Sequence, residues 1–169
     1  MLQLGKLITS SILSTTRRIK DLRITNVEVL KCGAGLRDFC FVKISTNGRK
    51  PITGWSEFIE ERNIGIVQVI EWMGQLIIGQ NPMPYSRIIS ELKANTCHIV
   101  GGIAQHAIGA IENALLDIVG KALNVPVCQL FGGPIRTELS VYWSHCGSFR
   151  INYSKQLQTP PLNSLKDIE

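Results

Sequence analysis

Long apolar runs are absent from the sequence. Gly, Glu or Gln interrupts each hydrophobic stretch before about 18 residues, the shortest length typical of a membrane-spanning helix, so we expect no membrane partner. Charged residues are also scarce, at 18%, whereas hydrophobic residues make up 44%, a balance typical of a soluble globular domain. A chain of 169 residues is long enough for one domain with a real core.

Acidic residues are missing from the first twenty positions, where Lys6, Arg17, Arg18 and Lys20 precede Asp21. These four cations account for most of the net charge of +5, and the rest of the chain is nearly neutral. Nucleic-acid binding needs cations clustered on a folded face, so we expect no nucleic-acid partner. The composition of 1–21 suits a disordered extension or a mitochondrial presequence. We expect a cytoplasmic protein, with a mitochondrial location as the alternative.

Paired cysteines are lacking as well. The five cysteines are odd in number and form no Cys-x-x-Cys motif; they are Cys32, Cys40, Cys97, Cys128 and Cys146. This pattern predicts free thiols in a reducing compartment. The two places where Cys and His are adjacent in sequence make poor tetrahedral geometry, so the sequence predicts no zinc site.

Alternating apolar residues dominate the first half of the chain. Three segments read as β-strands, at 24–30, 39–45 and 52–58. Gly33 and Gly35 mark a flexible loop after the first segment, and Asn47-Gly48 is a turn signal because both residues tolerate positive φ. Short links between sequential strands predict a three-stranded antiparallel meander.

The periodicity then changes to that of helices. Helices are predicted between an N-cap at Asn63 and a stop at Gly79, at about 85–95 and at about 103–123, the last with a continuous apolar stripe. Gly132-Gly133-Pro134 forces a turn, and Leu139–Ser144 reads as a fourth strand. Residues 152–163 are expected to form a loop, and a helix is expected to begin at Ser164. Strands followed by helices predict an α+β fold.

Three segments in order carry a family resemblance: Ile52–Glu57 (ITGWSE), Ile78–Pro82 (IGQNP) and Ala110–Gly133 (AIENALLDIVGKALNVPVCQLFGG). Together they resemble the mandelate racemase/muconate lactonizing enzyme group of the enolase superfamily. The resemblance implies an enolase-like N-terminal cap at 22–133, preceded by the extension 1–21. It also implies that 134–169 is the start of a (β/α) barrel that is truncated, because such barrels typically need about 250 residues.

The resemblance implies a Mg²⁺-dependent reaction that removes the proton α to a carboxylate, in a sugar-acid dehydratase or a racemase. The metal ligands and the catalytic base of the family fall on later barrel strands. After Gly133 the acids are Glu138, Asp167 and Glu169, and none matches those positions. We therefore assign no catalytic and no metal-binding residue to this chain. We expect it to bind no Mg²⁺ and to be inactive by itself.

Substrate contacts are implied for the cap loops and the end of the first barrel strand. Gly33 and Gly35 would let the first loop close, and Arg37 would meet a substrate carboxylate with two hydrogen bonds. Glu57 begins the second loop, 57–63, and His145 follows the first barrel strand. The implied ligand is a small carboxylate such as a sugar acid, and the family implies a homo-oligomer. The alternative is a non-catalytic cap that binds or assembles with a full-length homologue.

Overall fold

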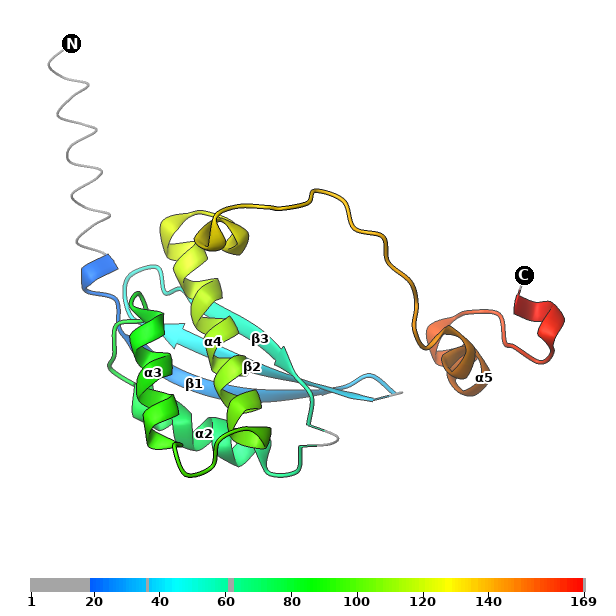
Figure 1. Cartoon of the computed structure of the whole chain (residues 1–169), viewed down its shortest axis with the longest axis horizontal. Coiled ribbons are helices and arrows are strands. Elements are labelled where there is room, and N and C mark those ends of the chain that lie inside the picture. The colour runs from blue at the N-terminus through cyan, green and yellow to red at the C-terminus, as the bar shows by residue number, and fades with distance from the viewer. Residues whose placement is uncertain (1–18, 36, 61–62, 169) are drawn as a thin grey trace, which may run out of the picture. The chain divides into compact units, whose positions relative to one another are not determined.

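A computed structural model describes residues 19–35, 37–60 and 63–168 (Figure 1). The chain forms two compact units. Unit 1 contains the residues up to Lys31 together with Phe39–Gly133, and unit 2 contains Cys32–Asp38 together with Pro134–Glu169. The extension at 1–18, with its presequence alternative, lies outside the described residues.

The sheet of unit 1 is built from β1 (Ile24–Gly33), β2 (Asp38–Thr46) and β3 (Thr53–Phe58), in the order β1-β2-β3. β2 and β3 pair antiparallel, with Cys40 opposite Phe58. The expected meander is therefore confirmed. Its turn after β2 contains Gly48 at φ 111°, the positive-φ conformation that the Asn-Gly pair predicts.

Three helices cover one face of the sheet (Figure 1). They are α2 (Ile66–Ile77), α3 (Tyr85–Asn95) and α4 (Gly102–Leu123), and a short 3₁₀ helix, η1 (Val127–Phe131), follows α4. The three predicted helices are confirmed, but the first begins at Ile66 after Gly65, two residues later than an N-cap at Asn63 predicts. α4 ends as Asn124 takes the left-handed conformation at φ 57°.

The core of unit 1 lies between this sheet face and the helices. The inward residues of β2 and the apolar stripes of the helices are buried, including Val42, Ile44, Ile66, Ile70, Met73, Ile77, Ile88, Leu92, Ala107, Ile111, Leu115 and Ile118. α4 packs most extensively against β3 and α2. The approach is close because Gly54 has no side chain: a Cβ there would meet the backbone oxygen of Ala114 and lie 2.7 Å from Ile118 Cγ1.

Unit 2 departs from the sequence prediction. The fourth strand predicted at Leu139–Ser144 is wrong: these residues belong to no strand, and the side chains of Leu139 and Val141 are 72% and 90% exposed. A strand needs a neighbour to complete its hydrogen-bond ladder, and the described part of unit 2 supplies none.

A helix follows instead, α5 (Cys146–Leu157), which corrects the loop predicted to begin at 152. Its residues have no apolar stripe and none of them is buried, so periodicity could not reveal it. The helix expected after Ser164 is a short 3₁₀ turn, η2 (Leu165–Ile168). Among residues 19–35, 37–60 and 63–168, no helix has the length and apolar character needed to cross a bilayer.

Candidate functional site

A cavity of about 530 Å³ lies in unit 1, between the carboxyl end of β3 and the first half of α4. Its walls come from three parts of the chain. The lining residues are Glu57, Phe58, Ile59, Asn63, Ile66, Gln105, His106, Gly109, Ala110 and Asn113. We call it the β3–α4 cavity.

The floor of the β3–α4 cavity is apolar. Phe58, Ile66 and Ala110 are each less than a tenth exposed, and they belong to the hydrophobic core. The strand pairing places Glu57 opposite Phe41, and its exposed side chain stands at the cavity wall. The cavity therefore joins a buried apolar base to a polar rim.

Asn63 is held at this rim by its own hydrogen bonds. Its Nδ2 donates to the carbonyl oxygen of Ile59 at 2.8 Å, and its backbone N–H donates to that of Glu60 at 2.7 Å. The carbonyl oxygen of Asn63 accepts from the N–H of Ile66 at 3.0 Å, at the start of α2. These bonds fix Asn63 between β3 and α2. Residues 61–62 of the predicted loop lie outside the described residues.

The opposite wall is one face of α4. His106, Gly109 and Asn113 follow each other at helical spacing, three and four residues apart, so they share that face. Gln105 lies beside His106, and the side chains of Gln105, His106 and Asn113 are exposed. A Cβ built on Gly109 would have no heavy atom within 4 Å, so this position opens directly into free space.

The sequence-predicted site residues divide between the units. Glu57 lines the β3–α4 cavity, whereas Gly33, Gly35, Arg37 and His145 belong to unit 2. The first cap loop closes through a hydrogen bond from the N–H of Ala34 to the carbonyl oxygen of Arg37, at 3.0 Å. Gly35 has φ 79°, and a Cβ there would lie 3.8 Å from Gln156 Cγ. The substrate contacts expected of all five residues stay predictions. Leu36, in the same loop, lies outside the described residues.

The predicted place of His145 at the end of a barrel strand is wrong for this structure. His145 stands directly before α5, and its ring stacks on Phe149 with the centroids 5.2 Å apart. Phe149 also makes edge contacts with Trp143 and Tyr153, at 6.4 and 5.8 Å. His145 is thus part of a small aromatic cluster in unit 2, because no strand forms before it.

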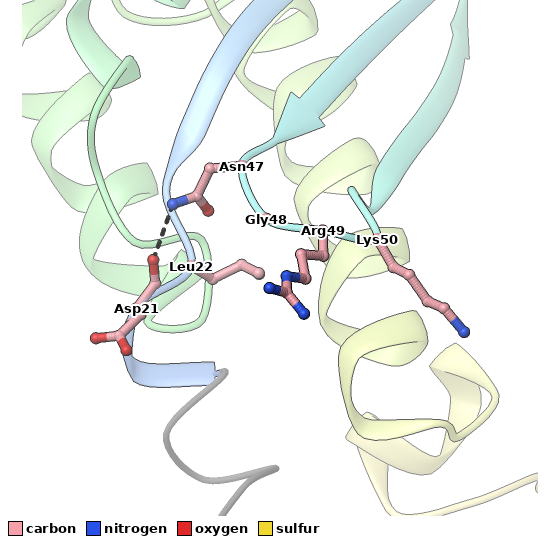
Figure 2. Close-up of a pocket in the computed structure, with 6 residues that line it drawn as sticks. All are labelled: Asp21, Leu22, Asn47, Gly48, Arg49 and Lys50. Carbon is pink, nitrogen blue, oxygen red and sulfur yellow. Dashed lines mark hydrogen bonds between the residues drawn. The ribbon is translucent and has the colours of Figure 1, made fainter.

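A second cavity, of about 380 Å³, lies beside the turn between β2 and β3. Figure 2 shows Arg49 reaching into the space between this turn and Leu22. Asn47 ties the turn to the segment before β1: its Nδ2 donates to the carbonyl oxygen of Asp21 at 3.1 Å, and its Oδ1 accepts from the N–H of Arg23 at 2.8 Å. The polar residues of this second cavity come from the turn and from Asp21, and the cavity holds none of the predicted site residues.

No cluster of metal ligands marks a magnesium site. Mg²⁺ takes oxygen ligands in octahedral geometry, often one or two carboxylates together with water. Across the described ranges, no group of three or more His, Cys, Asp or Glu side chains is placed to hold a metal ion. That the chain binds no Mg²⁺ stays a prediction.

Of the residues that line the β3–α4 cavity, the sequence analysis names Glu57 but not Gln105, His106 and Asn113. A signal for them was present. Polar residues at 105, 106 and 113 flank Gly109 on a helix whose other face is continuously apolar. Polar residues on a helix usually face solvent, so that pattern does not indicate a cavity until β3 is placed beside it.

Comparison with known proteins places the chain in a family. Residues 23–132 match the model of the mandelate racemase / muconate lactonizing enzyme N-terminal domain. A D-galactonate dehydratase of Variovorax paradoxus (strain S110) is 36% identical over 103 residues, which are 60% of this chain and 26% of that protein. The chain thus spans about a quarter of the length of the curated relatives it matches.

Solved structures agree with this assignment. One is from Burkholderia xenovorans strain LB400, is provisionally named an L-alanine-DL-glutamate epimerase, and is bound to magnesium and fumarate. Its sequence is 43% identical, its TM-score is 0.74, and the match covers 79% of this chain and 33% of that chain. An enolase from Pantoea ananatis with bound D-gluconate and Mg is 30% identical with a TM-score of 0.62, covering 68% and 28%. The chain therefore belongs to the mandelate racemase / muconate lactonizing enzyme family of the enolase superfamily, and its matched residues correspond to the N-terminal domain of that family.

Proposed function

We propose that this chain is the substrate-covering cap of a Mg²⁺-dependent enzyme that removes the proton α to the carboxylate of a sugar acid. The β3–α4 cavity carries the proposal, because it places polar side chains over an apolar floor within the matched domain. The D-galactonate dehydratase named above supports a sugar acid as the substrate class.

The reaction class has one first step and two outcomes. Removal of the proton at C2 leaves an enediolate, whose charge a divalent cation stabilises. In a dehydratase, the C3 hydroxyl group then takes up a proton and leaves as water, and the enol product tautomerises to a 2-keto-3-deoxy acid. In an epimerase, a proton returns to C2 from the opposite face. Dehydration is our first choice, and the similarity to the Burkholderia xenovorans structure makes epimerisation the second.

The base and the metal ligands of this reaction are proposed to lie outside the described residues. Magnesium is bound in the Burkholderia xenovorans and Pantoea ananatis structures, while the described part of this chain offers no suitable cluster. On this proposal the chain covers and orients the substrate and is inactive alone. The family context also leads us to propose a homo-oligomer.

Each cap loop, within its own unit, is proposed as a substrate contact on the ground of the family resemblance. Gly35, at positive φ, permits the tight bend of the first loop, and the exposed guanidinium of Arg37 suits a substrate carboxylate. Glu57 would meet the substrate from the second loop. His145 remains a proposed contact, now from the start of α5.

An assembly module is the second candidate, and one feature of unit 2 favours it. Large apolar side chains between Pro134 and α5 are strongly exposed: Ile135, Leu139, Val141 and Tyr142 are 72–99% accessible. Exposed apolar patches mark interaction sites. On this reading the chain joins a full-length homologue without contributing to catalysis.

A chimaera tests the proposal. Residues 23–132 replace the matched segment of the Variovorax paradoxus D-galactonate dehydratase, and formation of 2-keto-3-deoxy acid from D-galactonate is assayed with Mg²⁺. The proposal predicts turnover that requires the grafted cap, with the ungrafted barrel as control. A folded chimaera that binds Mg²⁺ but turns over no sugar acid would contradict it.

A further inference from the structure

We propose that the β3–α4 cavity binds adjacent hydroxyl groups of its ligand, and that Gln105, His106 and Asn113 of α4 are the residues that recognise them. The inference deepens the proposed function, on which it rests for the choice of a sugar acid as ligand. It assigns to α4 a role in specificity beside that of the cap loops.

The side chains of the cavity match hydroxyl groups. The amides of Gln105 and Asn113 both donate and accept hydrogen bonds, and the imidazole of His106 adds a further hydrogen-bonding group. A hydroxyl group likewise donates one bond and accepts others. Adjacent hydroxyls can therefore pair with adjacent side chains on one helix face.

The described lining of the cavity favours hydroxyl groups over a carboxylate. Among residues 57–60 and 63–113, those that line it include no Lys or Arg, and Glu57 contributes a negative charge. Carboxylates are bound by charged donors, most strongly by paired hydrogen bonds from Arg. A sugar acid would thus direct its carboxylate elsewhere and its hydroxylated chain toward α4.

The floor and size of the cavity suit the same ligand. Sugar chains combine polar hydroxyl edges with apolar C–H faces, and Phe58, Ile66 and Ala110 provide a buried apolar surface for the latter. A volume of about 530 Å³ falls within the range of small-molecule sites, about 300–1,000 Å³.

Gly109 supports the cavity as an open site. A glycine inside a helix is destabilising relative to alanine, so its presence usually has a packing reason. The helix glycines Gly74 and Gly120 have one: a Cβ on each would come within 3.0 Å of a neighbouring residue. A Cβ on Gly109 would meet nothing within 4 Å, as is also true of Gly147 in α5, but Gly109 lines the cavity. Glycine at this position therefore keeps the α4 wall of the cavity free of a side chain.

The test uses the full chain and three probes in an amide-resolved NMR titration. D-Galactonate carries hydroxyls and a carboxylate, galactitol carries hydroxyls alone, and propanoate carries a carboxylate alone. We expect D-galactonate and galactitol to shift the resonances of 57–60 and 105–113 with similar dissociation constants, of about 1–10 mM for a small open site. Propanoate should leave them unchanged.

Two variants separate recognition from folding. Gly109→Leu fills the free space without a clash and should weaken galactitol binding by about tenfold or more. Asn113→Leu removes one amide from the exposed rim and should weaken it as well. Gly109→Ala, which improves helix propensity with a single methyl group, is the matched control and should bind more tightly than Gly109→Leu.

The inference is overturned if galactitol leaves these resonances unchanged, if propanoate shifts them equally, or if Gly109→Leu binds like the unmodified chain. Galactitol has no carboxylate and cannot undergo α-proton removal, so its binding is independent of the proposed reaction. Galactitol binding with an inactive chimaera would reject the proposed function alone. An active chimaera without galactitol binding would reject the subsite alone.

Discussion

The carboxylate of Asp117 accepts a hydrogen bond from the backbone N–H of Trp55 at 2.9 Å, joining α4 to β3. One turn later, Lys121 Nζ donates to the same carboxylate oxygen at 2.7 Å and to the carbonyl oxygen of Thr53 at 2.8 Å. β3 is the last strand of the sheet, so these two side chains occupy backbone groups at its edge. They hold β3 against α4, whose other end lines the β3–α4 cavity.

Replacing Asp117 by Ala should lower the free energy of unfolding by about 1–2 kcal/mol, because both the bond to Trp55 and the pair with Lys121 are lost. Chemical denaturation measures the change. Lys121→Ala should cost less, about 0.5–1 kcal/mol, since the exposed i,i+4 pair and the exposed bond to the carbonyl oxygen of Thr53 both contribute little. Equal losses for the two variants would show that the bond from Trp55 to Asp117 is not the main stabilising contact.

Gly54→Ala should be strongly destabilising, by about 3 kcal/mol or more, because the new methyl group meets the Ala114 backbone and Ile118. The matched glycine is Gly109, where Gly109→Ala should stabilise by about 0.5–1 kcal/mol. Thermal unfolding of the two variants beside the unmodified chain checks both signs. A tolerated Gly54→Ala would show that β3 and α4 are not in close contact.

Met73→Ala removes a side chain that is fully buried between α2 and the sheet. We expect a loss of about 2–5 kcal/mol in unfolding free energy, as is usual when a large core residue becomes alanine. Met73→Leu conserves volume and should cost less than about 1.5 kcal/mol, which makes it the control. Similar stabilities for both variants would contradict the burial of Met73.

Asp167 gives a pH-dependent prediction in unit 2. The backbone N–H groups of Asn163 and Ser164 donate to its carboxylate at 2.8 and 2.7 Å, and they hold its pKa below the ordinary value of 3.8. The charged form is thus favoured in the folded turn. The contribution of Asp167 is present above the ordinary pKa and is lost as the pH falls through the lowered value.

NMR titration of the Asp167 carboxyl carbon measures this pKa directly. Ser164→Pro removes one backbone donor and also the hydroxyl group, which donates to the same carboxylate oxygen at 3.2 Å, so it should move the pKa of Asp167 back toward its ordinary value. An unshifted pKa in the unmodified chain would contradict the hydrogen-bonded turn.

The strands and helices of the cap could be predicted from the sequence because their hydrophobic periodicities are long and uninterrupted. The alternation through Cys40, Val42 and Ile44 and the stripe through Ile111, Leu115 and Ile118 each placed buried residues correctly. Asn124 ends α4 and Gly48 forms the turn after β2, and both residues have the positive φ that their residue types favour. In this region the turn and helix-end residues and the hydrophobic periodicity all predict the same elements. The hydrophobic pattern was therefore enough to predict the fold of the cap.

Unit 2 and the β3–α4 cavity were harder for physical reasons. Leu139 and Val141 have strand propensity, but strand formation depends on a neighbouring strand, which propensity cannot supply. α5 lacks an apolar stripe and gave no periodic signal. The cavity joins Glu57 to Asn113 across 56 positions of sequence, so it becomes visible only when β3 packs on α4.

The purified chain, incubated with D-galactonate and Mg²⁺ and assayed for 2-keto-3-deoxy acid, tests the central claim most directly. The claim is that this chain covers and orients a substrate while the base and the metal ligands lie outside its described residues. We predict no product above the rate without protein. Turnover by this chain alone, abolished by a chelator and restored by Mg²⁺, would contradict the account.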